Sequence, residues 1–239
     1  DWSSDVCLPI YYTFPYLGDL EYYRELVSDK ECYKKINALD KEGKDFIFCV
    51  TMQNHGGYGF DFEYSDMKEY IPDDKQPTYE FWNNEHYKEL ISGLGQETIP
   101  AANQYLNLTY ISDEALADYL ETLKESNEPT VFVMFGDHQP ALEFEWYNSK
   151  YSDGMNEYAK TADYYVVPYL MWANYDVDWE QHDKISANYL SAVLKRSCGL
   201  PLNEFDNVRL AAMEEYPVIT RYFAVNSNGK IPCNNWIFF

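Results

Sequence analysis

Asp137 and His138 stand side by side in the run MFGDHQP and are the residues of this chain best suited to binding a metal. The carboxylate offers a hard oxygen and the imidazole a nitrogen, a ligand set that suits manganese or zinc and, less well, magnesium. Two ligands do not close a metal site, and an aspartate at the end of a strand can instead cap the next helix. Spacing alone therefore leaves metal binding and a structural loop both open.

His55 lies in the glycine-rich run QNHGGYG. The two glycines let the backbone approach a ligand closely, and the imidazole can donate to an anionic oxygen or move a proton. In the other interpretation, the run is a tight turn after a strand and His55 bonds only to backbone. His86 and His182 lie in polar stretches, and we expect both of them on the surface.

Both motifs follow short apolar runs that are typical of buried strands, DFIFCVTM at residues 45–52 and TVFVMF at residues 130–135. Between them, residues 99–124 keep a helical period. Ligands of open α/β sheets bind at the carboxyl ends of strands. We therefore expect the two strands to lie parallel in one sheet. This arrangement would bring His55 within about 12 Å of Asp137, close enough for one phosphate and one metal to bridge them.

Three further segments complete the expected fold. Residues 18–39 carry apolar side chains at mixed three- and four-residue spacings and read as one or two helices, broken near Ser28. Pro168 either argues against a central strand in the apolar run that contains it, or marks a break before a strand at residues 169–173. Residues 185–196 form an amphipathic pattern with ordinary signals for a helix end. This order predicts an α/β fold with a mixed, largely parallel sheet sandwiched by helices.

The charge of the chain excludes one class of partner. Forty acidic residues against 18 basic ones give a formal net charge of −22, whereas binding to nucleic acid needs clustered lysine and arginine. No apolar run approaches the roughly 20 residues that span a bilayer, and the first residues carry no export signal. We therefore expect no nucleic acid partner, and we expect any membrane anchor outside this chain.

The five cysteines match no zinc-site or redox spacing. Cys49 lies within an apolar run, and we predict a reduced, buried thiol. The other four would allow up to two disulfides in an exported protein, with Cys198 to Cys233 as one pairing.

Four motifs follow one another in the order FIFCVTMQNHGGY, QYLNLTYISDEALADYLETL, EPTVFVMFGDHQP and VPYLMWANYD. Together they resemble the C-terminal portion of the catalytic domain in the lipoteichoic acid synthase branch of the sulfatase and alkaline phosphatase superfamily, from about residue 2 to residue 194. The resemblance implies an α/β fold with a divalent metal at the strand ends, Mn²⁺ in the first place and Mg²⁺ or Zn²⁺ as alternatives. It implies that Asp137 and His138 are metal ligands and that His55 holds the phosphate of the substrate or intermediate.

In that family, a threonine nucleophile and a further acidic ligand come N-terminal to the matching region. Thr13, Thr51 and Thr98 lie in other contexts, so no catalytic residue is assigned. We therefore expect residues 1–239 to be the C-terminal part of a sulfatase-like catalytic domain, without activity by itself and with weak affinity for divalent metal.

The function implied for the parent protein is metal-dependent transfer of a phosphoglycerol or similar head group. Its partner would be an anionic lipid head group or another phosphate or sulfate ester. Its place would be the extracytoplasmic face of the bacterial cell membrane, or the medium after release. The alternatives are a hydrolase of the sulfatase or phosphodiesterase type and a binding module without catalysis.

Overall fold

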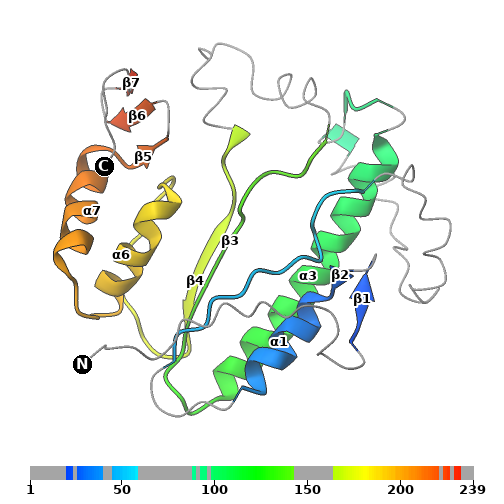
Figure 1. Cartoon of the computed structure of the whole chain (residues 1–239), viewed down its shortest axis with the longest axis horizontal. Helices are drawn as coiled ribbons and strands as arrows, with labels where there is room; N and C mark the ends of the chain where they lie inside the picture. The colour runs from blue at the N-terminus through cyan, green and yellow to red at the C-terminus, as the bar shows by residue number, and fades with distance from the viewer. Residues whose placement is uncertain are drawn as a thin grey trace. The chain divides into compact units, whose positions relative to one another are not determined.

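The chain is seen here as a computed structural model, in which two compact units form (Figure 1). The first unit consists of residues 1–125 and 140–146, and the second of residues 126–139 and 147–239. The structure describes residues 20–23, 26–39, 45–58, 88–89, 92–95, 98–142, 164–220, 223–226 and 229–232.

The first unit begins with a short antiparallel pair of strands, β1 (Tyr22–Tyr23) and β2 (Leu26–Val27). Helix α1 (Asp29–Asn37) follows directly, because the hydroxyl oxygen of Ser28 accepts from the Glu31 N–H at 3.2 Å and caps the first turn. The predicted helix over residues 18–39 is thus correct only from Asp29 onward. The aromatic and β-branched residues before the cap favour strands instead.

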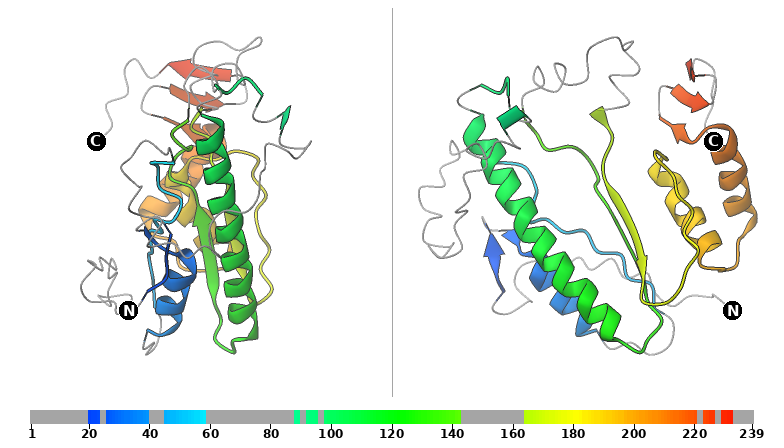
Figure 2. Two further views of the ribbon diagram at one scale, coloured as in Figure 1. Left: turned by 90° about the vertical axis from the view of Figure 1, so that its right-hand side faces the viewer. Right: turned by 180° about the vertical axis from the view of Figure 1, so that it is seen from behind.

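Helix α3 (Ile99–Glu125) is the longest element among the described residues of the first unit and confirms the helix predicted at residues 99–124. Figure 2 shows from two sides that α1 runs alongside it. The ring of Tyr33 on α1 stacks on the ring of Tyr119 on α3, with centroids 4.5 Å apart and planes within 3°. The buried residues of α3 follow a helical spacing, and they are Ala102, Asn107, Leu108, Ala115, Leu116, Tyr119 and Leu123.

The apolar run at residues 45–52 does not form the predicted buried strand. No strand is assigned to it, and its large side chains are exposed, with exposed fractions of 59% for Phe46, 46% for Phe48 and 63% for Val50. The predicted parallel pairing with residues 131–135 is not seen among the described strands. An apolar run becomes a buried strand only where a neighbouring strand pairs with it, and none of the described strands does so.

The second unit contains two strands at the predicted places, β3 (Val131–Phe135) and β4 (Tyr169–Ala173). They pair antiparallel in the register Val131 to Ala173 and Phe135 to Tyr169, and both are half-buried. Pro168 stands immediately before β4, where a residue without an N–H removes no bond from the ladder. Every strand pair in the described part of the chain is antiparallel, so the largely parallel pairing that we predicted is not seen there.

Helices α6 (Ala187–Ser197) and α7 (Glu204–Glu215) pack against each other in the same unit. Gly199, with φ of 66°, ends α6 where sequence signals placed the end of a helix. A small antiparallel sheet follows, made of β5 (Val218–Ile219), β6 (Phe223–Asn226) and β7 (Gly229–Pro232). The buried side chains that join the two helices are Tyr189, Ala192, Val193, Leu210 and Met213.

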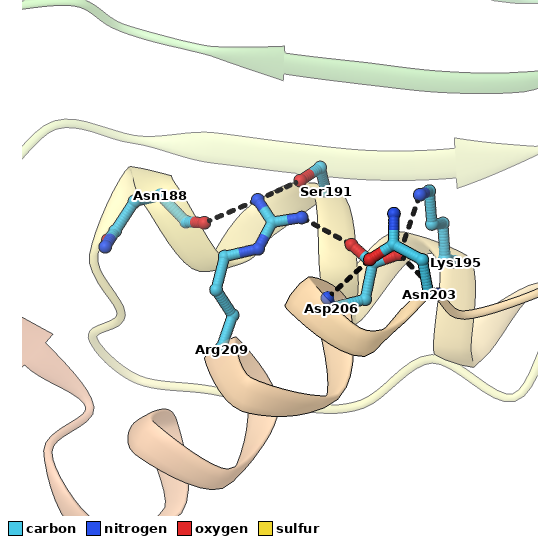
Figure 3. Close-up of polar contacts among 6 residues, drawn as sticks. All are labelled: Asn188, Ser191, Lys195, Asn203, Asp206 and Arg209. Carbon is cyan, nitrogen blue, oxygen red and sulfur yellow. Dashed lines mark hydrogen bonds and ion pairs between the residues drawn. The ribbon is translucent and has the colours of Figure 1, made fainter. Parts of the chain in front are cut away.

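A polar clamp also joins α6 to α7 (Figure 3). The Asp206 carboxylate has no exposed surface; it accepts from Lys195 Nζ at 2.8 Å and pairs with the Arg209 guanidinium. Asp206 and Asn203 also bond to each other's backbone N–H, which caps α7. None of the helices in the described residues is long and apolar enough to cross a bilayer.

Candidate functional site

The turn after β3 presents Asp137 and His138. Gly136 begins this turn, and its N–H donates to the carbonyl oxygen of Pro168 at 3.0 Å. A Cβ atom at position 136 would stand 3.0 Å from Cβ of Val167, tighter than an ordinary contact. Glycine therefore lets the turn lie close against the chain that enters β4.

Hydrogen bonds orient the two side chains of the predicted metal site. The backbone N–H of His138 donates to Oδ1 of Asp137 at 2.9 Å. Nδ1 of His138 lies 2.8 Å from the carbonyl oxygen of Gln139, and because a carbonyl can only accept, Nδ1 carries the proton. In the neutral ring, the lone pair is then on Nε2, which lies 3.5 Å from Oδ2 of Asp137.

This geometry fits one shared metal ion. Two ligands bound at about 2.1 Å to one ion stand roughly 3.0–3.4 Å apart, close to the Oδ2 to Nε2 separation. Both side chains are accessible, Asp137 at 80% and His138 at 58%. In metal-binding histidines, the ring nitrogen that does not bind the metal usually donates to a carbonyl or carboxylate, as Nδ1 of His138 does here.

Within the described residues, no cluster of three or more His, Cys, Asp or Glu side chains is placed to hold a metal. The metal itself stays a prediction.

His55 lies on an exposed loop of the first unit, within residues 52–58. Its backbone N–H donates to Met52 O at 3.0 Å, and Gly57 adopts a φ of 92°, a left-handed conformation that favours glycine. The Tyr58 hydroxyl donates to Asn54 O at 2.5 Å. The run thus forms a tight turn, as in the second interpretation of the sequence, but no strand is assigned to the residues before it.

A buried polar network holds the two residues before His55. Gln53 has no exposed surface; its amide nitrogen donates to Leu108 O at 3.2 Å and to Ser112 Oγ at 2.9 Å. Its amide oxygen accepts from the backbone N–H of Asp29 at 3.0 Å. Asn54 also donates to Ser112 Oγ at 2.9 Å, and Ser112 donates to Oδ2 of Asp29 at 2.6 Å.

Sequence reasoning missed this network. The one local signal was Ser28 followed three residues later by Glu31, which marks a helix start and so places Asp29 in a first turn. Burial raises the pKa of the Asp29 carboxyl, although hydrogen bonds from Ser112 and Thr51 act in the opposite direction.

His55 belongs to the first unit, and Asp137 and His138 belong to the second. Asp137 and His138 are neighbours in the sequence, and their side chains approach to 3.5 Å. The prediction that all three residues share one cleft stays a prediction.

Cys49 carries a free thiol, as predicted, but the thiol is half-buried rather than buried. Cys32 contacts it: their hydrogen bond raises the pKa of the Cys32 thiol and lowers the pKa of Cys49. Cys198 also carries a free thiol, and the predicted pairing with Cys233 involves a residue that the structure does not describe. Cys7 and Cys233 lie outside the described residues.

The other two histidines were expected on the surface. His86 lies outside the described residues, and His182 is half-buried rather than freely solvated, with Nε2 at 3.3 Å from Glu180 Oε2.

Comparison with known proteins gives three matches. A family model described as Sulfatase matches residues 6–194. A protein of Rhizobium meliloti (strain 1021) with the provisional name cyclic beta-1,2-glucan modification protein is 24% identical over 215 residues, 85% of this chain and 30% of the relative. The structure of Streptococcus pyogenes phosphoglycerol transferase GacH, in complex with sn-glycerol-1-phosphate, matches with a TM-score of 0.62 and 20% identity, over 84% of this chain and 45% of that chain.

This chain therefore spans less than half the length of either protein. The matches confirm the resemblance read from the motifs and the predicted α/β fold class.

Proposed function

The chain belongs to the sulfatase family, and we propose that it supplies metal-binding and phosphate-binding residues to a phosphotransferase of the lipoteichoic acid synthase type. The proposed reaction moves phosphoglycerol or a similar head group from an anionic lipid or another phosphate ester to an acceptor hydroxyl. The matched structure is named a phosphoglycerol transferase bound to sn-glycerol-1-phosphate, which supports a phosphate-ester substrate. The proposed place of action is the extracytoplasmic face of the bacterial cell membrane or the medium.

The orientation of the Asp137 and His138 pair carries this proposal. The carboxylate and Nε2 of the imidazole would hold Mn²⁺, with Mg²⁺ and Zn²⁺ as alternatives. When bound, the metal would stabilise charge on the transferring phosphoryl group and activate a hydroxyl nucleophile. His55, exposed on its loop, would donate to a phosphate oxygen of the substrate.

The loop of His55 makes a further contact within the first unit. A Cβ atom at Gly56 would lie 4.0 Å from Cβ of Ala141, which is ordinary van der Waals contact. Ala141 follows Asp137 by only four residues along the chain. The loop of His55 therefore lies against the segment that comes directly after MFGDHQP.

Hydrolysis of a sulfate or phosphate ester is the second candidate, because the matching family model is that of sulfatases. The two reactions differ in the acceptor, water in one and an alcohol in the other. With the full-length protein, free glycerol phosphate as the only product would select hydrolysis. A glycerol phosphate ester on an added sugar or glucan would select transfer, and the name of the Rhizobium relative makes a glucan hydroxyl a suitable acceptor to test.

The metal role can be tested by adding Mn²⁺ to the purified chain with ¹³C-labelled histidine, since only four histidines give signals. We expect Mn²⁺ to broaden the His138 ring signals first and Asp137→Ala to abolish that selectivity. Affinity should be low, because catalytic metal sites commonly use about three protein ligands.

His182 is a matched internal control. It also faces a carboxylate, Glu180, at 3.3 Å, but two hydrogen bonds of 2.6 Å from Arg196 already engage that carboxylate. Its signals should stay sharp at Mn²⁺ concentrations that broaden His138. Equal broadening of both rings, or broadening of His138 that survives in Asp137→Ala, would contradict the metal role.

A further inference from the structure

We propose that Ser112, on α3, is a positioning residue that fixes the His55 loop for phosphate binding, acting through Gln53 and Asn54. The inference rests on the proposed function, because it assumes that His55 holds a phosphate. Ser112 does not touch the substrate in this proposal. Its hydroxyl sets where His55 stands.

The hydroxyl of Ser112 uses its whole hydrogen-bonding capacity in this network. It donates its proton to Oδ2 of Asp29 at 2.6 Å and accepts from the side-chain amides of Gln53 and Asn54, both at 2.9 Å. A hydroxyl has one proton and two lone pairs. Because the proton points to a carboxylate, which is a strong acceptor, both lone pairs are directed to the loop.

The hydroxyl of Ser112 bonds to groups outside its own helix. A serine inside a helix usually donates back to the carbonyl four residues earlier, here Leu108 O. In this chain, Ser112 donates to Asp29 instead, and the Leu108 carbonyl receives the Gln53 amide at 3.2 Å. Two consecutive loop residues are therefore fastened to one turn of α3.

The network also ties the loop to α1. The backbone N–H of Asp29 belongs to the first turn of α1, where no carbonyl of the same helix can accept it. Gln53 accepts this N–H at 3.0 Å. The residue directly before Asn54 and His55 is thus bonded to both α1 and α3 and has no exposed surface.

These contacts predict what loss of the hydroxyl does. Alanine is the better helix former, so Ser112→Ala keeps α3 intact. It leaves Gln53 and Asn54 without their common acceptor and Asp29 without its Ser112 donor. Loss of these hydrogen bonds should free the loop, move the His55 ring and weaken phosphate binding about tenfold.

The test uses the whole chain with ¹³C-labelled histidine and sn-glycerol-1-phosphate as the probe. Two readouts are taken: the His55 ring signal without the probe, and the dissociation constant for the probe. Wild type is compared with Ser112→Ala, Ser112→Thr, His55→Ala and Thr122→Ala. The last variant is the matched control, because Thr122 is an exposed α3 residue whose hydroxyl donates only to Asp118 O, on its own helix.

We expect Ser112→Ala to shift or broaden the His55 signal and leave the His182 signal unchanged, with Ser112→Thr restoring the wild-type spectrum. Thr122→Ala should match wild type in both readouts. If Ser112→Ala does not fold, Asn54→Ala, which removes a single bond to Ser112, should move the His55 signal in the same direction.

The outcomes separate this inference from the proposed function. If His55→Ala abolishes binding but Ser112→Ala binds like wild type, the inference is wrong and the proposed function stands. If wild type does not bind the probe, or His55→Ala binds equally well, the phosphate role of His55 fails. The ring signal still decides the structural claim in that case, because an unchanged His55 signal in Ser112→Ala overturns it.

Discussion

At the scale of single residues, Asp29 combines burial with a place at the start of a helix. Burial raises the pKa of its carboxyl above the ordinary value of 3.8, against hydrogen bonds from Ser112 and Thr51. The folded state therefore holds this proton more tightly than the unfolded state does. The resulting stability is fully present below the unfolded pKa and is lost as the pH rises through the folded pKa.

Asp29→Asn should remove this pH dependence, because asparagine keeps an oxygen acceptor for Ser112 but carries no charge to desolvate. Urea unfolding at a series of pH values from about 3 to 7 measures it. The stability of wild type relative to the variant should fall as the pH rises. A difference that stays constant with pH would mean that burial of Asp29 does not affect its titration.

At the scale of elements, the clamp between α6 and α7 should respond to acid in the opposite sense. The Lys195 ammonium, the Asn203 backbone and Arg209 lower the pKa of Asp206 from 3.8 to about 2. The stability that this gives is present above the unfolded pKa and is lost as the pH falls through the folded one.

Lys195→Met keeps the aliphatic stem and removes the largest cause of that shift. We expect the variant to lose less stability than wild type between about pH 4 and pH 2, because a smaller part of its folding free energy depends on ionised Asp206. Lys124→Met is a control, since Lys124 pairs with Glu121 at an exposed site. Parallel acid unfolding curves for wild type and Lys195→Met, followed by circular dichroism, would contradict the clamp.

A second element-scale prediction concerns the contact between α1 and residues 45–52. The thiols of Cys32 and Cys49 share a hydrogen bond and are both free and half-buried. An added disulfide such as oxidised glutathione should therefore oxidise them by exchange to one intramolecular disulfide, releasing two reduced glutathione molecules.

Closing a loop of roughly 15 residues stabilises a fold by about 3 kcal/mol in the chain-entropy model. Peptide mapping should find the Cys32 to Cys49 link, and thermal unfolding should shift upward. Cys198→Ser should leave both results unchanged. A mixed disulfide with glutathione at Cys49 that never resolves would show that the thiols do not meet.

The same elements show what could be predicted from the sequence. The helix at residues 99–125 and the strands 131–135 and 169–173 were predicted correctly, because their apolar spacing and flanking residues are local signals. The run at residues 45–52 was predicted as a strand from the same kind of signal, but whether a strand forms depends on a partner. The Ser112 to Asp29 bond joins residues 83 apart, and no local pattern encodes such a contact.

At the scale of the whole molecule, the net charge of −22 affects every metal experiment. A strongly acidic surface attracts divalent cations without a specific site, and salt screens this attraction. Binding at Asp137 and His138 is therefore best measured at physiological ionic strength, where salt screens the nonspecific attraction. Selectivity of one ring signal over another is then more informative than the total Mn²⁺ bound.

The last prediction is that Mn²⁺ at Asp137 and His138 acts on His55, although these residues belong to different units. If one phosphate and one metal bridge them, the His55 ring lies within about 12 Å of the bound ion. Paramagnetic relaxation of the His55 ring protons at low Mn²⁺ occupancy gives this distance, and the effect should vanish in Asp137→Ala. A distance well above 12 Å, in a chain that still binds Mn²⁺ at His138, would place the phosphate ligand and the metal in separate sites.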